Sequence, residues 1–150
     1  MAGFSLHIGL NRIDPNHYDG WSGPLNACES DAKAMQKICT SRGFQTELLL
    51  SANATREAVA HRLTGFAAAM VAGDTLVVSY AGHGGQLPDA NADEDDGLDE
   101  TWCLFDGQMV DDELYRAWAT FKPGVRIAVF SDSCHSGTVA RALVRTEGRE

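Results

Sequence analysis

The chain has 150 residues, 44% of them apolar, and a formal net charge of −9. This length predicts one domain with a proper hydrophobic core, and the apolar content excludes a disordered chain. The acidic balance disfavours nucleic acid and anionic membrane surfaces as partners, because both carry negative charge. No run of 18 apolar residues exists, so we expect no membrane span.

The four cysteines favour a reducing compartment. They stand at positions 28, 39, 103 and 134 without a CxxC spacing, which argues against both a zinc site and a disulfide scaffold. The first three sit within apolar patterns and are predicted to be structural. The N-terminus lacks the basic region and long apolar stretch of a signal peptide. We therefore expect a cytoplasmic protein.

In chain order, the hydrophobic pattern alternates between strand and helix. Apolar runs bounded by turn residues predict strands at 4–10, 44–50, 75–80, 101–105 and 125–130. Helical spacing predicts helices at 29–42 and 55–71, and the carboxylates at 111–113 begin another. Loops are expected at 11–24 and 89–100. Strands separated by helices predict an α/β fold with a mostly parallel sheet covered on both faces.

Each of the two longer helices has one apolar face that is expected to point inward. These faces are Ala32, Met35, Ile38 and Cys39 on the first helix, and Val59, Leu63, Phe66 and Met70 on the second. Glycine at 43 and 73 follows the two helices, as is usual just past a helix end.

Two of the predicted strands end at a reactive side chain. The strand at 75–80 continues into Ala-Gly-His-Gly-Gly-Gln, and the strand at 125–130 continues into Ser-Asp-Ser-Cys-His-Ser-Gly. In an open α/β sheet, sites form at the carboxyl ends of strands, where glycine-rich turns let side chains meet. Cys134 is therefore predicted to be a nucleophile and His83 its base.

These two segments resemble the His and Cys boxes of the metacaspases, the caspase-like peptidases of bacteria, plants, fungi and protists. Cys134 follows His83 by about 50 residues, which is the spacing of caspases. Asp-Ser-Cys stands where animal caspases have Gln-Ala-Cys, and this difference points to the metacaspase branch. The similarity covers 4–139. It implies a caspase-like three-layer α/β/α sandwich, with 1–150 as its catalytic large-subunit (p20-like) domain and the sheet incomplete in this chain.

Peptide hydrolysis needs an activated thiol and a stabilised oxyanion. A thiol with an ordinary pKa of about 8.5 is mostly protonated at neutral pH, so a nearby imidazole must raise its thiolate fraction. His83 would do this for Cys134 and would then protonate the leaving amine. By resemblance, the backbone N–H groups of Cys134 and Gly84 hold the carbonyl oxygen as it gains charge. Caspase-like enzymes use a Cys/His dyad, so no third orienting residue is expected.

Other interpretations of Cys134 compete with this one. A cysteine after a buried strand is most often a small core residue, although a histidine among three glycines is hard to explain as part of a core. A phosphatase loop needs Arg where this chain has Ala140, and Arg141 comes one position late. His135 is a second candidate base, but successive side chains diverge, so we expect it on a loop or rim.

The resemblance also implies a pocket for the residue before the cut. In metacaspases, two carboxylates select Arg or Lys there, and the first corresponds to Asp132. The second lies in a Leu-x-Gly-Cys-x-Asn-Asp-Ala pattern, which this chain matches at Asp31 but not at Ala27 or Ser30. A buried pair of carboxylates is costly without a cation, which favours a basic ligand. The alternative for Asp31 is a first-turn helix carboxylate. Ala81 replaces a serine that is frequent in the family.

The resemblance also implies that calcium can bind. Metacaspases that need calcium bind it through acidic residues between the His and Cys boxes and one acidic residue after the nucleophile. Asp99, Asp111 and Asp112 match the first group, and their hard oxygen atoms suit Ca²⁺. Arg141 stands near the place of the last acidic residue, which should weaken the site. The loop at 89–100 lacks the glycine of an EF-hand and is otherwise a solvated acidic loop.

Few residues follow Cys134, whereas the family fold continues with further strands. We therefore expect either a large-subunit fragment or a second polypeptide, such as a small (p10-like) subunit from the same precursor. The segment 140–150 contains three arginines and is interpreted as a processing tail.

The sequence therefore predicts a self-processing cysteine endopeptidase that cleaves protein or peptide substrates after Arg or Lys. The alternative is a catalytically silent caspase-like scaffold or calcium-responsive binding module.

Overall fold

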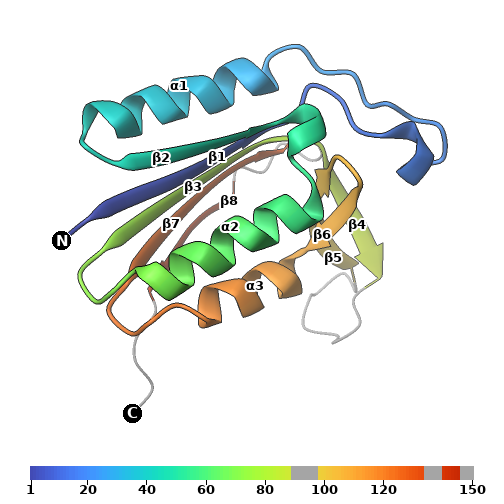
Figure 1. Cartoon of the computed structure of the whole chain (residues 1–150). Coiled ribbons are helices and arrows are strands. Elements are labelled where there is room, and N and C mark those ends of the chain that lie inside the picture. Colours follow the sequence, from blue (N-terminus) through green and yellow to red (C-terminus); the bar gives the residue numbers. More distant parts are fainter. Residues whose placement is uncertain (89–97, 134–139, 146–150) are drawn as a thin grey trace.

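The structure is a computed structural model, and it describes residues 1–88, 98–133 and 140–145, with the backbone alone for 86–88, 98–100 and 140–145. Within these residues, five strands form one sheet in the order β2-β1-β3-β7-β8 (Figure 1). In sheet order they are Gln45–Leu50, Gly3–Gly9, Thr75–Gly82, Arg126–Ser133 and Ala140–Arg145. The first four are mutually parallel, and β8 is antiparallel to β7. The prediction of a mostly parallel sheet is therefore confirmed.

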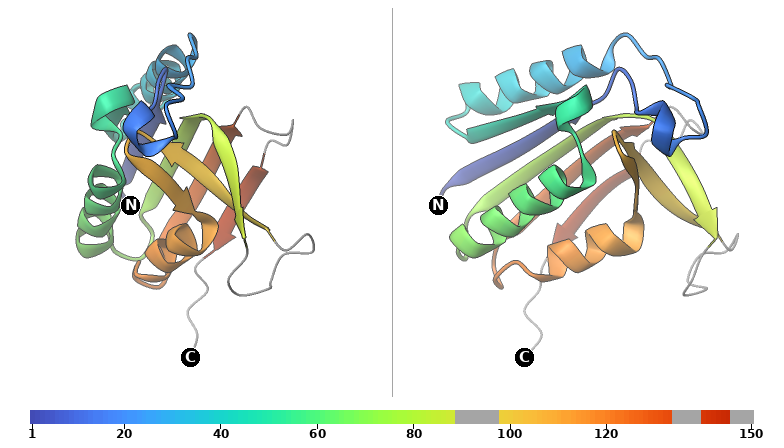
Figure 2. Two further views of the ribbon diagram at one scale, coloured as in Figure 1. Left: turned by 90° about the vertical axis from the view of Figure 1, so that its right-hand side faces the viewer. Right: turned by 45° about the vertical axis from the view of Figure 1, so that its right-hand side comes forward.

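Helices cover both faces of this sheet (Figure 2). They are α1 (Cys28–Ser41), α2 (Arg56–Ala69) and α3 (Asp111–Ala119). The ring of Phe4 in β1 lies 5.9 Å from that of Phe66 in α2, whereas a Cβ at Gly9 would lie 2.7 Å from the Cβ of Ala32 in α1. Side chains an odd number apart on a strand point to opposite faces. Hence α1 covers one face, and α2, with α3 packed beside it, covers the other.

The inward faces of the helices largely follow their predicted pattern. All four residues expected to face inward from α2 and its end are buried: Val59, Leu63, Phe66 and Met70. On α1, Ala32 and Cys39 are buried, but Ile38 is 52% exposed, so the prediction for Ile38 was wrong. The buried stripe of α1 includes Cys28, and Ile38 lies about 90° around the helix from the centre of that stripe.

A second sheet, which the sequence pattern did not predict, lies beyond the ends of β3 and β7 (Figure 2). Within the described residues its strands are β4 (Gly84–Pro88), β5 (Leu98–Leu104) and β6 (Gly107–Val110), paired antiparallel in that order. The predicted strand at 101–105 thus corresponds to the end of β5. Residues 98–100, which were expected to end the acidic loop, are the beginning of β5. Two glycines begin β4 despite their poor strand propensity, because cross-strand pairing outweighs intrinsic preference.

Several element boundaries also differ from the predictions. Pairing with neighbouring strands extends β3 to Gly82 and β7 to Ser133, beyond the predicted ends at 80 and 130. The first part of the 140–150 segment forms β8 along the edge of β7. Cys28, Cys39 and Cys103 are buried and form no disulfide among the described residues, as expected. In the part of the chain that is described, no helix combines the length and apolarity needed to cross a membrane.

Candidate active site

His83 lies directly after β3, at the carboxyl end of the parallel strands. The pairing of β3 with β7 continues to its last pair, Gly82 with Ser133. His83 is the next residue on one strand, and Cys134 is joined to Ser133 by one peptide bond on the other. Cys134 itself lies outside the described residues, as does His135. The described part of the site is therefore the base, its supports and the neighbouring pocket.

The ring of His83 is fixed by a backbone carbonyl from a distant loop. Its Nε2 atom lies 2.9 Å from the carbonyl oxygen of Gly23. A carbonyl can only accept a hydrogen bond, so Nε2 carries the proton and Nδ1 keeps the basic lone pair. The ring of Trp21, half exposed, packs on the imidazole with centroids 4.6 Å apart. The half-buried imidazole is thus held as the tautomer that can accept a proton at Nδ1.

Glycine is required at position 23 for this contact. Its φ is +52°, and a Cβ built there would lie 2.9 Å from both Cδ2 and Nε2 of His83. The loop that carries it is anchored, since Ile13 donates to Ser22 at 2.9 Å and the Tyr18 hydroxyl donates to the Leu104 carbonyl at 2.6 Å. Neither Trp21 nor Gly23 is predicted as a site residue by the sequence. A Gly-Pro pair at 23–24 indicated a turn, but nothing local indicated contact with His83.

The peptide between His83 and Gly84 is held from its carbonyl side. That oxygen accepts a hydrogen bond from the Tyr80 hydroxyl at 2.6 Å and from the Cys103 N–H at 3.0 Å. Because a peptide unit is planar, fixing the carbonyl oxygen also fixes the direction of the Gly84 N–H. Burial raises the pKa of Tyr80 well above its ordinary value, so the phenol stays a donor. The backbone of Gly84 is therefore rigid where a donor is expected.

The second sheet supports both strand ends at once. The rings of Tyr80 and Trp102 stack with centroids 4.6 Å apart and planes 6° from parallel. The indole N–H of Trp102 donates to the hydroxyl of Ser131 at 3.0 Å. Trp102 in β5 thus contacts β3 through Tyr80 and β7 through Ser131. This arrangement positions the segments just before His83 and Cys134 relative to each other.

Asp31 and Asp132 line one pocket, although they are far apart in the sequence. The pocket has a volume of about 330 Å³ and lies on the α1 face of β3 and β7. Asp31 comes from the first turn of α1 and Asp132 from the end of β7, and both are exposed. Ala32 and Met35 of α1 contribute apolar lining. The pocket can therefore accept a side chain with an apolar stem and a cationic end.

The expected calcium ligands are only partly described. Asp111 and Asp112 stand in the first turn of α3, where the helix dipole favours carboxylates, as predicted. Asp99 lies in β5, paired with Leu87, and its side chain is outside the description. Among the described side chains, no group of three or more His, Cys, Asp or Glu residues could hold a metal ion. Calcium binding stays a prediction.

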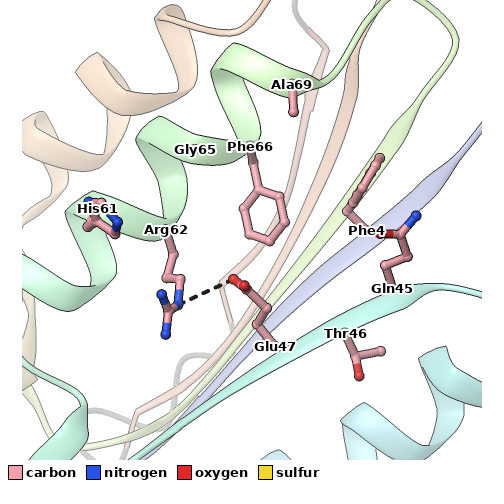
Figure 3. A pocket seen from close by; sticks show the side chains of 9 residues that line it. All are labelled: Phe4, Gln45, Thr46, Glu47, His61, Arg62, Gly65, Phe66 and Ala69. Atoms are coloured by element: carbon pink, nitrogen blue, oxygen red, sulfur yellow. Dashed lines mark ion pairs between the residues drawn. The ribbon is translucent and has the colours of Figure 1, made fainter.

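A different pocket of about 400 Å³ lies between β2 and α2 (Figure 3). It includes Phe4 and Phe66, with an ion pair of 3.4 Å between Arg62 Nε and Glu47 Oε2. Phe4 lies near the beginning of β1, on the face covered by α2. This pocket is therefore at the opposite end of the strands from His83 and on the opposite face from Asp132.

Comparison with known proteins assigns the chain to a family. The family model described as metacaspase, peptidase C14 domain, matches residues 5–142. Metacaspase-1A of Aspergillus terreus is 34% identical over 89% of this chain and 36% of its own length, and Metacaspase-1 of Cryptococcus neoformans is 37% identical over 89% and 31%. The chain thus spans about a third of the length of these relatives.

A solved structure agrees with this assignment. The crystal structure of protein GSU0716 from Geobacter sulfurreducens superimposes with a TM-score of 0.84 at 54% sequence identity, and covers 92% of this chain and 52% of that one. A match over nearly the whole chain, by sequence and by structure, leaves one conclusion. The chain belongs to the metacaspase, peptidase C14 family of caspase-like cysteine peptidases.

Proposed function

We propose that this chain carries the catalytic dyad of a cysteine endopeptidase, with Cys134 as nucleophile and His83 as base. The observation that supports it most is the parallel pairing of β3 and β7 up to Gly82 and Ser133, because the next residue on each strand is a member of the dyad. His83 meets the requirement for a base, since its Nε2 is engaged by the Gly23 carbonyl and Nδ1 keeps the lone pair.

The reaction proceeds through two acyl transfers. Nδ1 of His83 takes the thiol proton, and the Cys134 sulfur attacks the scissile carbonyl carbon. The oxygen of that carbonyl gains negative charge and is held by backbone N–H groups, with that of Gly84 among them. The C–N bond then breaks, and His83 returns the proton to the leaving amine. Water, deprotonated by His83, hydrolyses the thioester and regenerates the thiol.

The pocket beside the dyad supports cleavage after a basic residue. Asp31 and Asp132 line it together, and a pair of carboxylates at one pocket is best satisfied by an ammonium or guanidinium group. Asp132 is two residues before the nucleophile, and by resemblance to metacaspases we assign this pocket to the residue whose carbonyl is attacked. The proposed substrates are accordingly proteins or peptides with Arg or Lys before the cut.

Self-processing and a small (p10-like) subunit are parts of the same proposal. The relatives extend well beyond this chain, so a further polypeptide segment would complete the substrate groove. Arg141 and Arg145 lie in β8, whose backbone pairs with β7. Cleavage at either bond therefore requires β8 to leave the edge of the sheet, whereas Arg149 follows β8 in the sequence.

Fluorogenic peptides test this function directly. We expect turnover of an Arg peptide by the parent protein, none by Cys134→Ala, and none of an Asp peptide, each measured with and without Ca²⁺. Asp31→Asn should lower the turnover of the Arg peptide about tenfold or more, because a carboxylate that binds the guanidinium is lost. Glu29→Gln is the matched control, because Glu29 lies in the same turn of α1 but bonds Asn11 and Ser51. Preference for the Asp peptide would overturn the pocket assignment.

Absence of any turnover from a complete, processed protein would favour the silent scaffold instead. For self-processing, mass spectrometry of the protein should show cleavage after Arg that is missing in Cys134→Ala. Identical fragments from both proteins would end that part of the proposal.

A further inference from the structure

Three hydrogen-bonded polar side chains, Ser79, His7 and Ser5, lie in a row on the α1 face of the sheet, starting at the candidate pocket. We call them the polar row. His7 in β1 stands opposite Ser79 in β3, and its Nδ1 lies 2.7 Å from the Ser79 hydroxyl oxygen. Its Nε2 lies 2.8 Å from the hydroxyl oxygen of Ser5. His7 and Ser5 have no exposed surface, and Ser79 is 5% exposed. The imidazole thus joins two buried hydroxyls.

Ser79 belongs to the pocket as well as to the polar row. It lines the same cavity of about 330 Å³ as Asp31 and Asp132. It lies on the same face of β3 as Ala81, which is paired with Asp132. Two residues along a strand correspond to about 7 Å. Ser79 is therefore deeper than Asp132 in the direction a substrate side chain would enter from the strand ends.

Burial lowers the pKa of His7 to about 4, so at physiological pH the ring is neutral, and one of its nitrogens donates while the other accepts. In the Nε2–H tautomer, Ser5 accepts a hydrogen bond from the ring and Ser79 donates its own hydrogen to Nδ1. In the Nδ1–H tautomer these two roles are exchanged.

A serine hydroxyl can act as donor or acceptor. In the Nε2–H tautomer the ring takes the Ser79 hydrogen, and the Ser79 oxygen is left as an acceptor for a group in the pocket that it lines with Asp31 and Asp132.

We propose that His7 is the Nε2–H tautomer and that Ser79, oriented by it, is a specificity-determining residue that accepts a hydrogen bond from the cationic end of the substrate side chain. This inference rests on the proposed function, because it concerns the same pocket. An ammonium group has three donors and a guanidinium five, so a donor that points toward β3 can bond the Ser79 oxygen while others bond Asp31 and Asp132, which line the same pocket.

Calorimetry on the protein carrying Cys134→Ala, which prevents turnover, tests the proposal with a peptide amide that ends in arginine. Adding Ser79→Ala should weaken binding about tenfold, the usual loss for a hydrogen bond to a charged group. Thr101→Val is the matched control, since it removes an equally buried hydroxyl that bonds Gln108 and does not line the pocket; it should change affinity by less than about threefold. A peptide ending in the uncharged isostere citrulline should bind weakly to all three proteins.

Equal affinity of the Ser79→Ala protein and its parent, together with loss of binding in Asp132→Asn, would overturn this inference and leave the proposed function standing. Binding unaffected by Asp132→Asn would overturn both. Nitrogen NMR of the His7 ring provides an independent readout. We expect the Nε2–H tautomer in the free protein, and a changed Nδ1 shift in Ser79→Ala. An Nδ1–H tautomer would make Ser79 a donor toward the pocket and would contradict the proposal.

Discussion

Two histidines on neighbouring strands of the same sheet show how position decides chemistry. His7 lies in the middle of β1, has no exposed surface, and has a serine hydroxyl at each ring nitrogen. His83 lies just past the end of β3, is half-buried, and has one nitrogen fixed by the Gly23 carbonyl. Desolvation lowers the pKa of His7 to about 4, so its ring is neutral at physiological pH. In the proposed function, His83 at the strand end is the residue that takes and returns a proton.

The strongest test of this comparison removes the base itself. His83→Ala should lower kcat/KM for an Arg peptide by at least about 10³-fold, because general-base assistance and the thiolate are both lost. The free energy of unfolding should change by only about 1 kcal/mol, since one partly exposed hydrogen bond is removed. Peptide turnover and chemical denaturation measure the two effects. His61→Gln, on the exposed surface of α2, is the control that should match the parent in both; activity retained in His83→Ala would place the base elsewhere.

A smaller effect is expected when the support of His83 is displaced. Gly23→Ala puts a Cβ against the imidazole at a backbone φ that favours glycine. A misplacement of about 1 Å costs about 10²-fold in kcat. The matched control is Gly20→Ala, which has a φ of +87° but no atom within 4 Å of the added Cβ. If both variants lost activity equally, loop strain rather than contact with His83 would be the cause.

His7 should be visible in the pH dependence of stability. Its pKa is about 4 when folded against an ordinary 6.5, so between these values the unfolded chain binds a proton that the folded chain does not. Stability from this group is therefore complete above pH 6.5 and falls as the pH drops towards 4, by up to about 3 kcal/mol. Urea denaturation of the parent and of His7→Gln at several pH values isolates the difference. The variant should be less stable at pH 7 and lack this part of the pH dependence; parallel curves would contradict the assignment.

The smallest effect is expected far from both histidines. Arg62→Gln breaks the ion pair with Glu47, in which both side chains are about 40% exposed. Such pairs contribute less than about 1 kcal/mol. Peptide turnover should be unchanged, because the pocket in Figure 3 lies at the other end and on the other face of the sheet. A clear loss of turnover would mean that this pocket and the site are coupled.

Sequence periodicity and spacing were sufficient for the general architecture. The α/β class, the parallel strands and His83 at a strand end all follow from local patterns, and the resemblance of the boxes at 83–86 and 132–137 led to the family. Local signals failed at Ile38, which lies to the side of the buried stripe of α1, and at β4 and β6, which depend on pairing. Trp21 and Gly23 were missed because their role is a contact with a residue about 60 positions away.

The sequence by itself determined which residue types stand at the ends of the two strands, because hydrophobic periodicity and short motifs are local properties. Only the tertiary structure decided which nitrogen of His83 bonds the Gly23 carbonyl, how Trp102 contacts both strands, and that Ser79, which bonds His7, lines the pocket of Asp31 and Asp132. Each of these depends on the positions of side chains and carbonyls from separate elements. Such positions are set by sheet register and packing, which no local pattern encodes.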